Sequence, residues 1–269
     1  MEQTKLTDLT PFQAWFEDCP GALVAFSGGV DSSLVAFLAR TLLGRKRVVA
    51  VISASPSLKL SDLDTAKAFC LGHDIPLRVI RTAELENPDY YTNPANRCYF
   101  CKHTLYSDLD AYAQEFAGWW LLNGTNQNDL GDYRPGIQAG REFQVRSPLA
   151  ECNFQKSAVR ALASALDLEC WDKPASPCLS SRIPYGQLVT EQKLRQIEAG
   201  EQFLNELGFP VVRVRHNDDR AVVEVPGERL ADLGGVADTV SEHLLGLGFQ
   251  AVEIDREGFV SGKLNRTLS

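Results

Sequence analysis

The sequence predicts an α/β fold in which a parallel sheet, covered by helices on both faces, is followed by a smaller α+β domain. Short apolar runs alternate with helical patterns through the first half of the chain, as in consecutive βαβ units. A turn with two adjacent glycines, within residues 27–32, follows the first apolar run directly and opens a helix. The chain of 269 residues is long for one domain and short for three, because domains commonly have roughly 150 residues.

The elements of the first half follow from the spacing of the apolar residues. Short, mainly apolar runs predict buried strands, and apolar residues three or four positions apart predict the helices between them. Because crossovers between parallel strands are right-handed, the helices cover both faces of the sheet, and ligands bind at the carboxyl ends of the strands. We expect strands at residues 22–26, 48–52, 77–80 and 119–122, and helices at residues 32–43, 61–71, 98–116 and 154–166.

A change of pattern near Lys173 predicts a domain boundary, with one domain at residues 1–172 and the other at residues 173–269. Residues 170–183 are rich in proline and serine and predict an ordered loop. Thr190 is a helix cap and Gly208 a helix stop, so a helix is expected between them. The remaining elements are strands at residues 211–215, 221–225 and 250–254 and helices at residues 228–233 and 236–247.

The composition excludes several classes of protein. Hydrophobic residues make up 44% and charged residues 23% of the chain, as in globular proteins. The formal net charge of −8 repels polyanions, which disfavours general nucleic-acid binding. No apolar run reaches the roughly 18 to 20 residues of a membrane span, and the first residues do not resemble a signal peptide. We therefore expect a cytoplasmic protein that does not bind membranes.

The segment Ser27-Gly28-Gly29-Val30-Asp31-Ser32 predicts a phosphate site. Two glycines allow a tight turn whose N–H groups converge on an anion, and the helix N-terminus and the serine hydroxyls add further donors. The segment lacks the lysine and the spacing of a Walker A loop, which disfavours transfer of a γ-phosphoryl group. The alternative is a plain glycine turn in which Asp31 or Ser32 caps the helix.

Seven cysteines, an odd number, argue against a disulfide framework and favour reduced thiols or a metal site. Cys98 and Cys101 share one face at the start of a predicted helix, where thiol pKa values are lowered, and Cys178 lies in the proline- and serine-rich loop. An open site with three thiolates is favoured over a closed zinc site because the available fourth ligands do not form a second pair. The other cysteines are expected mainly to fill space: Cys19, Cys70 and Cys170, with Cys152 undecided.

The S-G-G-x-D-S segment resembles the PP-loop of the N-type ATP pyrophosphatases, which cleave ATP between the α and β phosphates. The resemblance implies a PP-loop (adenine nucleotide alpha hydrolase-like) first domain, with adenine held by the backbone of residues 51–53. Residues 123–129 resemble the segment that closes over the nucleotide. Asp31 and Asp129 are then the candidate Mg²⁺ ligands, although both residues are also suited to capping a helix or turn. The implied ATP-binding residues are Ser27, Gly28, Gly29, Asp31, Ser32, Ser53, Gly124, Thr125, Asp129 and Arg134.

Five motifs together look like the LarE family of ATP-dependent sulfur transferases: SGGVDS, RCYFCK, NGTNxxDxxDxRPG, WDKP and CLSSRIPYG. This resemblance implies adenylation of a carboxylate of pyridinium-3,5-biscarboxylic acid mononucleotide, followed by attack of sulfur to give a thiocarboxylate. The family has two sulfur sources. Either one cysteine, here Cys178, gives up its own sulfur, or three cysteines hold a 4Fe-4S cluster that relays sulfide. Because Cys98 and Cys101 accompany Cys178, we predict the cluster type.

A nucleotide substrate needs a second phosphate pocket. Arg213 and Arg215 lie on one face of a predicted strand, and Arg182 lies near Cys178, so their guanidinium groups suit a phosphate. The alternative is that these arginines are solvated or paired with carboxylates. The predicted catalytic residues are Cys178, Lys102 and Arg182. Ser180 and Ser181 are assigned to the substrate phosphate together with Arg213 and Arg215, and Lys102 and Arg134 to the leaving pyrophosphate.

The expected partners are a nucleotide-like small molecule, a sulfide donor and further copies of the chain. Two alternatives stay open. PP-loop tRNA thiolases also combine the loop with C-x-x-C and a distant third cysteine, but they need a basic track for tRNA, which the net charge of −8 disfavours. The second alternative is an ATP-binding or zinc-binding module without sulfur chemistry.

Overall fold

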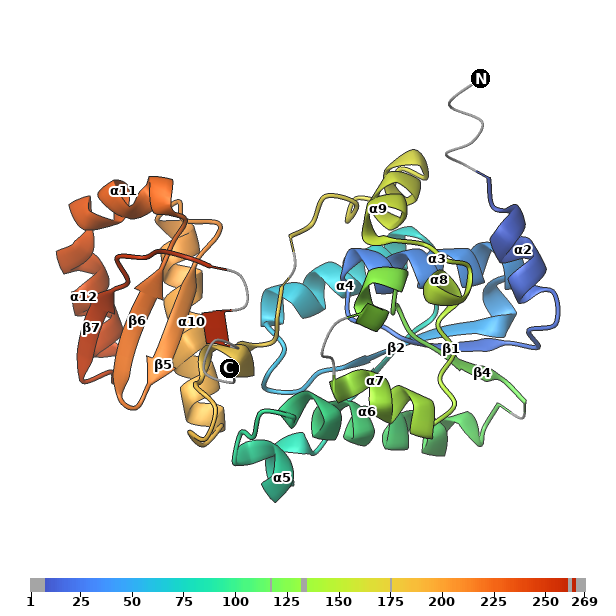
Figure 1. Cartoon of the computed structure of the whole chain (residues 1–269), viewed down its shortest axis with the longest axis horizontal. Coiled ribbons are helices and arrows are strands. Elements are labelled where there is room, and N and C mark those ends of the chain that lie inside the picture. Colours follow the sequence, from blue (N-terminus) through green and yellow to red (C-terminus); the bar gives the residue numbers. More distant parts are fainter. Residues whose placement is uncertain (1–7, 117, 132–134, 175, 261–262, 265–269) are drawn as a thin grey trace. The chain divides into compact units, whose positions relative to one another are not determined.

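The computed structural model describes residues 8–116, 118–131, 135–174, 176–260 and 263–264. The chain forms two compact units, and the first comprises Met1–Glu84 and Cys98–Ser176 (Figure 1). The second comprises Leu85–Arg97 and Pro177–Ser269. The sequence analysis placed residues 85–97 in the first domain. They lie in the second unit because Tyr90, Asn93 and Arg97 hydrogen-bond to residues of the 178–189 segment.

A four-stranded parallel sheet in the order β3-β2-β1-β4 forms the centre of the first unit. The strands are β1 (Ala22–Ala25), β2 (Val48–Ser53), β3 (Leu77–Ile80) and β4 (Trp120–Leu122). The helices are α2 (Thr10–Phe16), α3 (Val30–Leu43), α4 (Leu60–Gly72), α6 (Arg97–Ala113), α7 (Pro135–Glu142), α8 (Pro148–Glu151) and α9 (Lys156–Ala165). This confirms the predicted α/β class with a parallel sheet.

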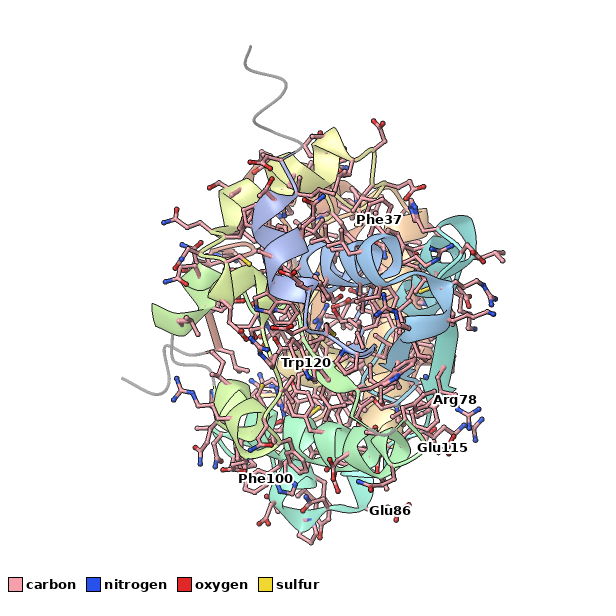
Figure 2. The ribbon with its side chains drawn as sticks, turned by 90° about the vertical axis from the view of Figure 1, so that its right-hand side faces the viewer. Phe37, Arg78, Glu86, Phe100, Glu115 and Trp120 are labelled. Atoms are coloured by element: carbon pink, nitrogen blue, oxygen red, sulfur yellow. The ribbon has the colours of Figure 1, made fainter. Side chains whose placement is uncertain are left out.

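Side chains alternate between two apolar layers, one on each face of the sheet. Ala22 and Val24 of β1 pack into the cluster formed with α2, α3, α4 and α9, whereas Leu23 and Ala25 pack against α6 and α7. Figure 1 shows α3 and α4 on one side of the sheet and α6 and α7 on the other. In Figure 2 the labelled Phe37 of α3 and Glu115, just beyond α6, lie on either side of Trp120 in β4. Strands β1, β2 and β4 are therefore covered on both faces, as is usual in parallel sheets, whereas the edge strand β3 is partly exposed, with Val79 41% exposed.

The second unit contains a three-stranded sheet in the order β5-β6-β7. β5 (Arg213–Asn217) and β6 (Arg220–Glu224) form an antiparallel hairpin, and β7 (Ala251–Ile254) runs parallel to β6. The helices are α5 (Pro88–Tyr91), α10 (Glu191–Glu206), α11 (Leu230–Gly235) and α12 (Ala237–Gly246). Thr190 caps α10 by accepting a hydrogen bond from the Lys193 backbone N–H, as predicted.

Short elements account for most differences from the sequence prediction. Helices α2, α5, α7 and α8 were not predicted, because four to eight residues are too few for a clear 3.6-residue period. Among its described residues, the 170–183 segment forms the short 3-10 helix η4 (Leu179–Arg182). Elsewhere the structure has η1 (Arg45–Arg47), η2 (Glu84–Glu86), η3 (Gln127–Gly131) and η5 (Gly227–Arg229). Within the described ranges no helix is both long and apolar enough to cross a membrane.

Candidate active site

The predicted phosphate loop joins the carboxyl end of β1 to the N-terminus of α3. Gly28 has a φ of +70°, a left-handed conformation that favours glycine, and a Cβ there would lie 3.1 Å from the Ala66 Cβ. The Ser32 hydroxyl accepts from the Ser27 backbone N–H (3.1 Å) and donates to the Gly29 carbonyl (3.1 Å). The first turn of α3 has no side-chain cap, because Ser32 closes the loop instead. The N–H groups at this helix end are therefore suited to an anion.

The segment after β4 packs directly onto this loop. A Cβ at Gly124 would lie 2.6 Å from the Ser32 backbone nitrogen and 2.9 Å from the Asp31 carbonyl carbon, so only glycine fits. The Asn123 side-chain oxygen accepts from the Thr125 N–H (3.0 Å) and the Ser147 hydroxyl (2.8 Å), which holds the turn in place. Gly124 and Thr125, which the sequence analysis assigned to ATP, therefore lie beside the phosphate loop.

The two carboxylates predicted to bind Mg²⁺ have different surroundings. Asp31 accepts from the Asn126 amide (3.1 Å) and forms an ion pair with Lys156 at the start of α9. Asp129 is buried and accepts from the Asn126 backbone N–H (3.0 Å), as a turn cap does. The sequence analysis did not choose between the two. The structure favours Asp31, because its side chain is 22% exposed and already pairs with the cationic side chain of Lys156. The sequence analysis missed Lys156, which lies 125 positions from Asp31 in the chain.

The predicted adenine position lies at the end of β2. The Val51 carbonyl accepts from the Phe26 N–H (2.8 Å) and is therefore used within the sheet. The Ser53 hydroxyl is 2.6 Å from the Thr82 hydroxyl, and Thr82 in turn donates to the buried carboxylate of Glu84. Of the three residues predicted to hold adenine, Ser53 is the last residue of β2, at the carboxyl end of the strand.

Lys102, Cys98 and Cys101 lie in the first turns of α6. The start of α7 approaches them closely, because a Cβ at Gly136 would lie 2.9 Å from the Lys102 Cγ and 3.5 Å from the Cys98 carbonyl oxygen. Cys98 is exposed and Cys101 half-buried. Arg134, also assigned to the pyrophosphate, lies outside the described residues.

In the second unit, Arg182 has a role different from the predicted one. Its side chain is fully buried and forms two hydrogen bonds with Glu201, of 2.8 and 3.0 Å. It also donates to the carbonyls of Pro177 (2.6 Å) and Cys178 (3.1 Å). Arg182 therefore holds the backbone around the exposed Cys178 thiol and does not offer a free guanidinium to a substrate.

The two predicted serines are also used within the fold. Ser180 is buried, its hydroxyl lies 2.7 Å from the Tyr90 hydroxyl, and its carbonyl accepts from Arg97 (2.9 Å). Ser181 is half-buried, and its hydroxyl accepts from Arg182 (3.0 Å). Ser180 is therefore removed from the substrate-binding set because its side chain has no access to solvent.

Of the two arginines on β5, one is paired and one is not neutralised. Arg215 forms a bidentate ion pair with Glu224 (3.0 and 2.9 Å) and donates to the Ser181 carbonyl. Arg213 donates to the Val212 carbonyl and lies over the Phe259 ring (5.1 Å). Burial, followed by the nearby Arg182 charge, lowers the pKa of Arg213 to about 10. Arg213 is thus a largely desolvated cation beside another guanidinium, and a bound anion would stabilise its charged form.

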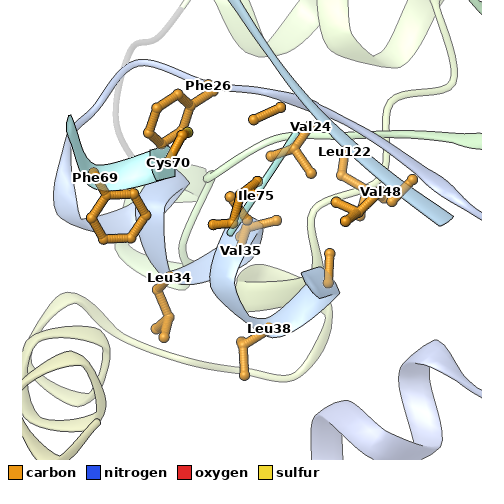
Figure 3. Close-up of a cluster of buried hydrophobic side chains, with 14 of the residues drawn as sticks. Val24, Phe26, Leu34, Val35, Leu38, Val48, Phe69, Cys70, Ile75 and Leu122 are labelled. Carbon is orange, nitrogen blue, oxygen red and sulfur yellow. The ribbon is translucent and has the colours of Figure 1, made fainter. Parts of the chain in front are cut away.

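The thiols separate by environment. Burial raises the pKa of Cys70 to about 12 and that of Cys152 to about 11, and it also raises the pKa values of Cys19 and Cys170. Figure 3 shows Cys70 among Phe26, Phe69 and other apolar side chains. These thiols are poor metal ligands because ligation requires the thiolate.

The exposed or half-exposed donors left for an iron–sulfur cluster are Cys98, Cys101 and Cys178, whose chemistry fits that group. The first two belong to one unit and the third to the other. Across the described part of the chain, no three His, Cys, Asp or Glu side chains are assembled for a metal ion.

Comparison with known proteins agrees with this geometry. Residues 17–87 match the NAD synthase family model, which covers the phosphate loop. The chain is 42% identical to an uncharacterized protein of Synechocystis sp. over the full length of both chains. It is 27% identical to one of the subunits of the glutamine-hydrolyzing GMP synthase of Thermoplasma acidophilum, over 64% of this chain and 59% of the relative.

A fourth match decides the family. Pyridinium-3,5-bisthiocarboxylic acid mononucleotide synthase of Lactiplantibacillus plantarum is 39% identical, over 99% of this chain and 96% of its own length. An identity of this size over both chains, together with the PP-loop match and the parallel sheet, confirms the resemblance seen in the motifs. The chain belongs to the LarE family of ATP-dependent sulfur transferases.

Proposed function

We propose that this chain uses ATP to activate the carboxylates of pyridinium-3,5-biscarboxylic acid mononucleotide and converts them to thiocarboxylates, with sulfide delivered at Cys98, Cys101 and Cys178. The observation that carries the proposal is the packing of Gly124 onto the first turn of α3, which builds a phosphate cradle from two segments. The near full-length similarity to a synthase named for the bisthiocarboxylic acid product supports this substrate.

The activation step needs positive charge near the phosphates, because negative charge develops on the leaving pyrophosphate. A carboxylate oxygen of the substrate attacks the α-phosphorus of ATP, the bond to the bridging oxygen breaks, and pyrophosphate leaves. Backbone N–H groups of the Ser27–Ser32 loop stabilise the α-phosphate in this arrangement. Asp31 would hold the Mg²⁺ that accompanies ATP, and Lys156, which forms an ion pair with Asp31, would supply positive charge near the phosphates. Lys102 is assigned to the same leaving group.

The sulfur step uses the two exposed thiols, Cys98 and Cys178, and the half-buried thiol of Cys101. A sulfur nucleophile attacks the acyl carbon, and AMP leaves as the carbon–oxygen bond to the phosphate breaks. Cys98, Cys101 and Cys178 would hold a 4Fe-4S cluster, which supplies sulfide when it is bound. One contact within the second unit supports this set. Arg97, the residue immediately before Cys98, donates to the carbonyl of Ser180, which lies two positions after Cys178.

The substrate phosphate is assigned to Arg213. Three guanidinium groups, those of Arg182, Arg213 and Arg215, accompany two carboxylates, and both carboxylates are used in bidentate pairs. Among the described contacts of these three arginines, Arg213 is the one without a carboxylate pair, and burial, followed by the nearby Arg182 charge, lowers its pKa to about 10. Arg215 and Ser181, which are joined by a hydrogen bond from the Arg215 guanidinium to the Ser181 carbonyl, are assigned to the same phosphate.

Anaerobic reconstitution with iron and sulfide, followed by turnover with ATP and the substrate, tests the proposal. We expect a brown protein with broad absorbance near about 400 nm, release of AMP and pyrophosphate, and a thiocarboxylate product. The colour is lost in Cys98→Ala, Cys101→Ala and Cys178→Ala and kept in Cys70→Ala, the matched buried thiol.

Other outcomes would contradict particular parts of the proposal. A Cys178 that becomes lighter by roughly 34 Da, the loss of H₂S, would show that the cysteine gives up its own sulfur. Binding of tRNA with a steep salt dependence would favour a tRNA thiolase. A colourless protein with one zinc per chain would favour a module without sulfur chemistry. The proposal also includes a cytoplasmic homo-oligomer, which light scattering on the purified chain and cell fractionation test.

A further inference from the structure

We propose that Lys173 is a positioning residue for the nucleotide site: it holds the Gly28–Gly29 peptide in the orientation that aims the Gly29 N–H at a phosphate. The inference rests on the proposed binding of ATP at the Ser27–Ser32 loop. Lys173 is outside the phosphate loop and the cysteine set. The sequence analysis used it to mark a boundary and as part of the WDKP motif, and assigned it no role in binding.

Two contacts place the Lys173 ammonium against the loop. Its Nζ lies 3.3 Å from the Gly28 carbonyl oxygen and 3.0 Å from the Asp62 Oδ1. The other oxygen of Asp62 accepts from the Ser176 hydroxyl (2.8 Å). The Lys173 side chain is 22% exposed and that of Asp62 is 16% exposed. The pair is therefore shielded enough to hold one geometry, unlike most surface ion pairs.

The peptide between Gly28 and Gly29 explains what this contact does. A trans peptide points its C=O and N–H in opposite directions, and the chain has no cis peptide bond among the described residues. With the Gly28 carbonyl bound to Lys173, the Gly29 N–H points to the other side, toward the Ser27 hydroxyl (3.4 Å). A flipped peptide would present a carbonyl oxygen to the phosphates, which repels them. Because glycine at Gly28 places little restriction on this flip, a partner for the carbonyl is needed.

The backbone that carries Lys173 is itself held from α9. The Arg160 guanidinium donates to the carbonyls of Trp171 (3.1 Å) and Lys173 (2.9 Å). The Lys173 backbone N–H donates to the Cys170 carbonyl (3.1 Å). The ammonium therefore extends from a backbone held in place, and its contacts with Asp62 and Gly28 determine its position. The side chain is already ordered in the folded chain, so ATP binding does not have to order it.

The charge of Asp62 distinguishes positioning from a direct phosphate contact. If Lys173 simply attracted phosphate, removal of the neighbouring Asp62 charge would tighten ATP binding by reducing repulsion. If Lys173 acts by holding the loop, Asp62 is its anchor, and loss of that charge weakens ATP binding. Asp62→Asn therefore changes affinity in opposite directions under the two mechanisms.

The experiment is calorimetric titration of the full chain with α,β-methylene ATP and Mg²⁺. We expect Lys173→Met to raise the dissociation constant roughly 10- to 100-fold, as loss of a charge-assisted hydrogen bond does. Asp62→Asn raises it in the same direction, and Lys173→Arg recovers part of the loss. The matched controls are Lys67→Met and Asp64→Asn, which break an exposed pair on the same helix α4 (3.1 Å) and leave binding and the melting temperature unchanged.

Unchanged affinity in Lys173→Met, or tighter binding in Asp62→Asn, would overturn the inference while the wild-type chain still binds the nucleotide. Absence of binding by the wild-type chain would instead overturn the proposed function, and this inference with it. A melting temperature that falls in Lys173→Met, without rescue of affinity by Lys173→Arg, would also contradict a positioning role.

Discussion

Replacing Glu201 with glutamine leaves the buried guanidinium of Arg182 without its counter-charge. The two side chains are 0% and 1% exposed and share two hydrogen bonds, of 2.8 and 3.0 Å, and Glu201 also accepts from the Val214 N–H at 3.2 Å. Breaking one partner of a buried pair costs about 3 to 5 kcal/mol. We therefore expect Glu201→Gln to lower the free energy of unfolding by that amount and the melting temperature by on the order of 10 °C.

Urea titration followed by circular dichroism measures the change, and the chain offers a matched control. Arg220 and Glu253 form an ion pair in the same unit at 3.1 Å, but their side chains are 53% and 56% exposed. Glu253→Gln should cost less than about 1 kcal/mol. The double variant Arg182→Met with Glu201→Leu should recover most of the stability and still lack sulfur transfer. The Pro177 and Cys178 carbonyls then lose the guanidinium donor, and the Cys178 carbonyl is left with the Ser181 N–H. Equal stabilities of Glu201→Gln and Glu253→Gln would refute the reasoning.

Three further outcomes are expected. Gly124→Ala should abolish ATP binding because its Cβ would meet a backbone nitrogen at 2.6 Å, whereas Gly72→Ala, which meets no described atom within 4 Å, should not; similar affinities would contradict the packing argument. Alkylation of the metal-free chain at pH 8 should modify Cys98 and Cys178 but spare Cys70, as peptide mass spectrometry would show; early modification of Cys70 would contradict its burial. The free energy of unfolding should fall as the pH rises from about 8.5, the ordinary thiol pKa, toward about 12, the pKa of Cys70, because the Cys70 thiol ionises over this range only in the unfolded state. In Cys70→Ala the free energy of unfolding should fall less steeply with pH, and equal slopes would count against the raised pKa.

The long elements and the phosphate loop could be predicted because their signals are local. The alternation of strands and helices and the Gly28-Gly29 turn depend on neighbours in the sequence. The parallel sheet confirms the alternation, and the φ of +70° at Gly28 fits a glycine turn. The pairing of Asp31 with Lys156 depends on residues 125 positions apart, which no periodicity reveals. The lysine that pairs with Asp31 could therefore be identified only from the structure.

The arginines show a second limit of sequence reasoning. Arg182 and Arg215 were assigned to a phosphate because guanidinium groups suit it, but their carboxylate partners Glu201 and Glu224 lie on a helix and a neighbouring strand. A sequence shows the period of β5, and hence the shared face of Arg213 and Arg215, but not which of the two is already neutralised. Among the described contacts of these three arginines, Arg213 is the one that forms no carboxylate pair and so can offer its charge to a phosphate, as the prediction required.

The second unit is completed by residues 85–97, so the chain passes between the two units three times, after Glu84, Arg97 and Ser176. A C-terminal fragment cut at the last crossing would lack Tyr90 and Arg97. The buried Ser180 hydroxyl would lose its Tyr90 partner, and the Ser180 carbonyl would lose the Arg97 guanidinium while keeping the Ile183 N–H. One proteolytic nick between the units would not release either of them. Inheritance of the two units as separate modules is therefore restricted, and swaps between relatives should exchange residues 85–97 together with the C-terminal part.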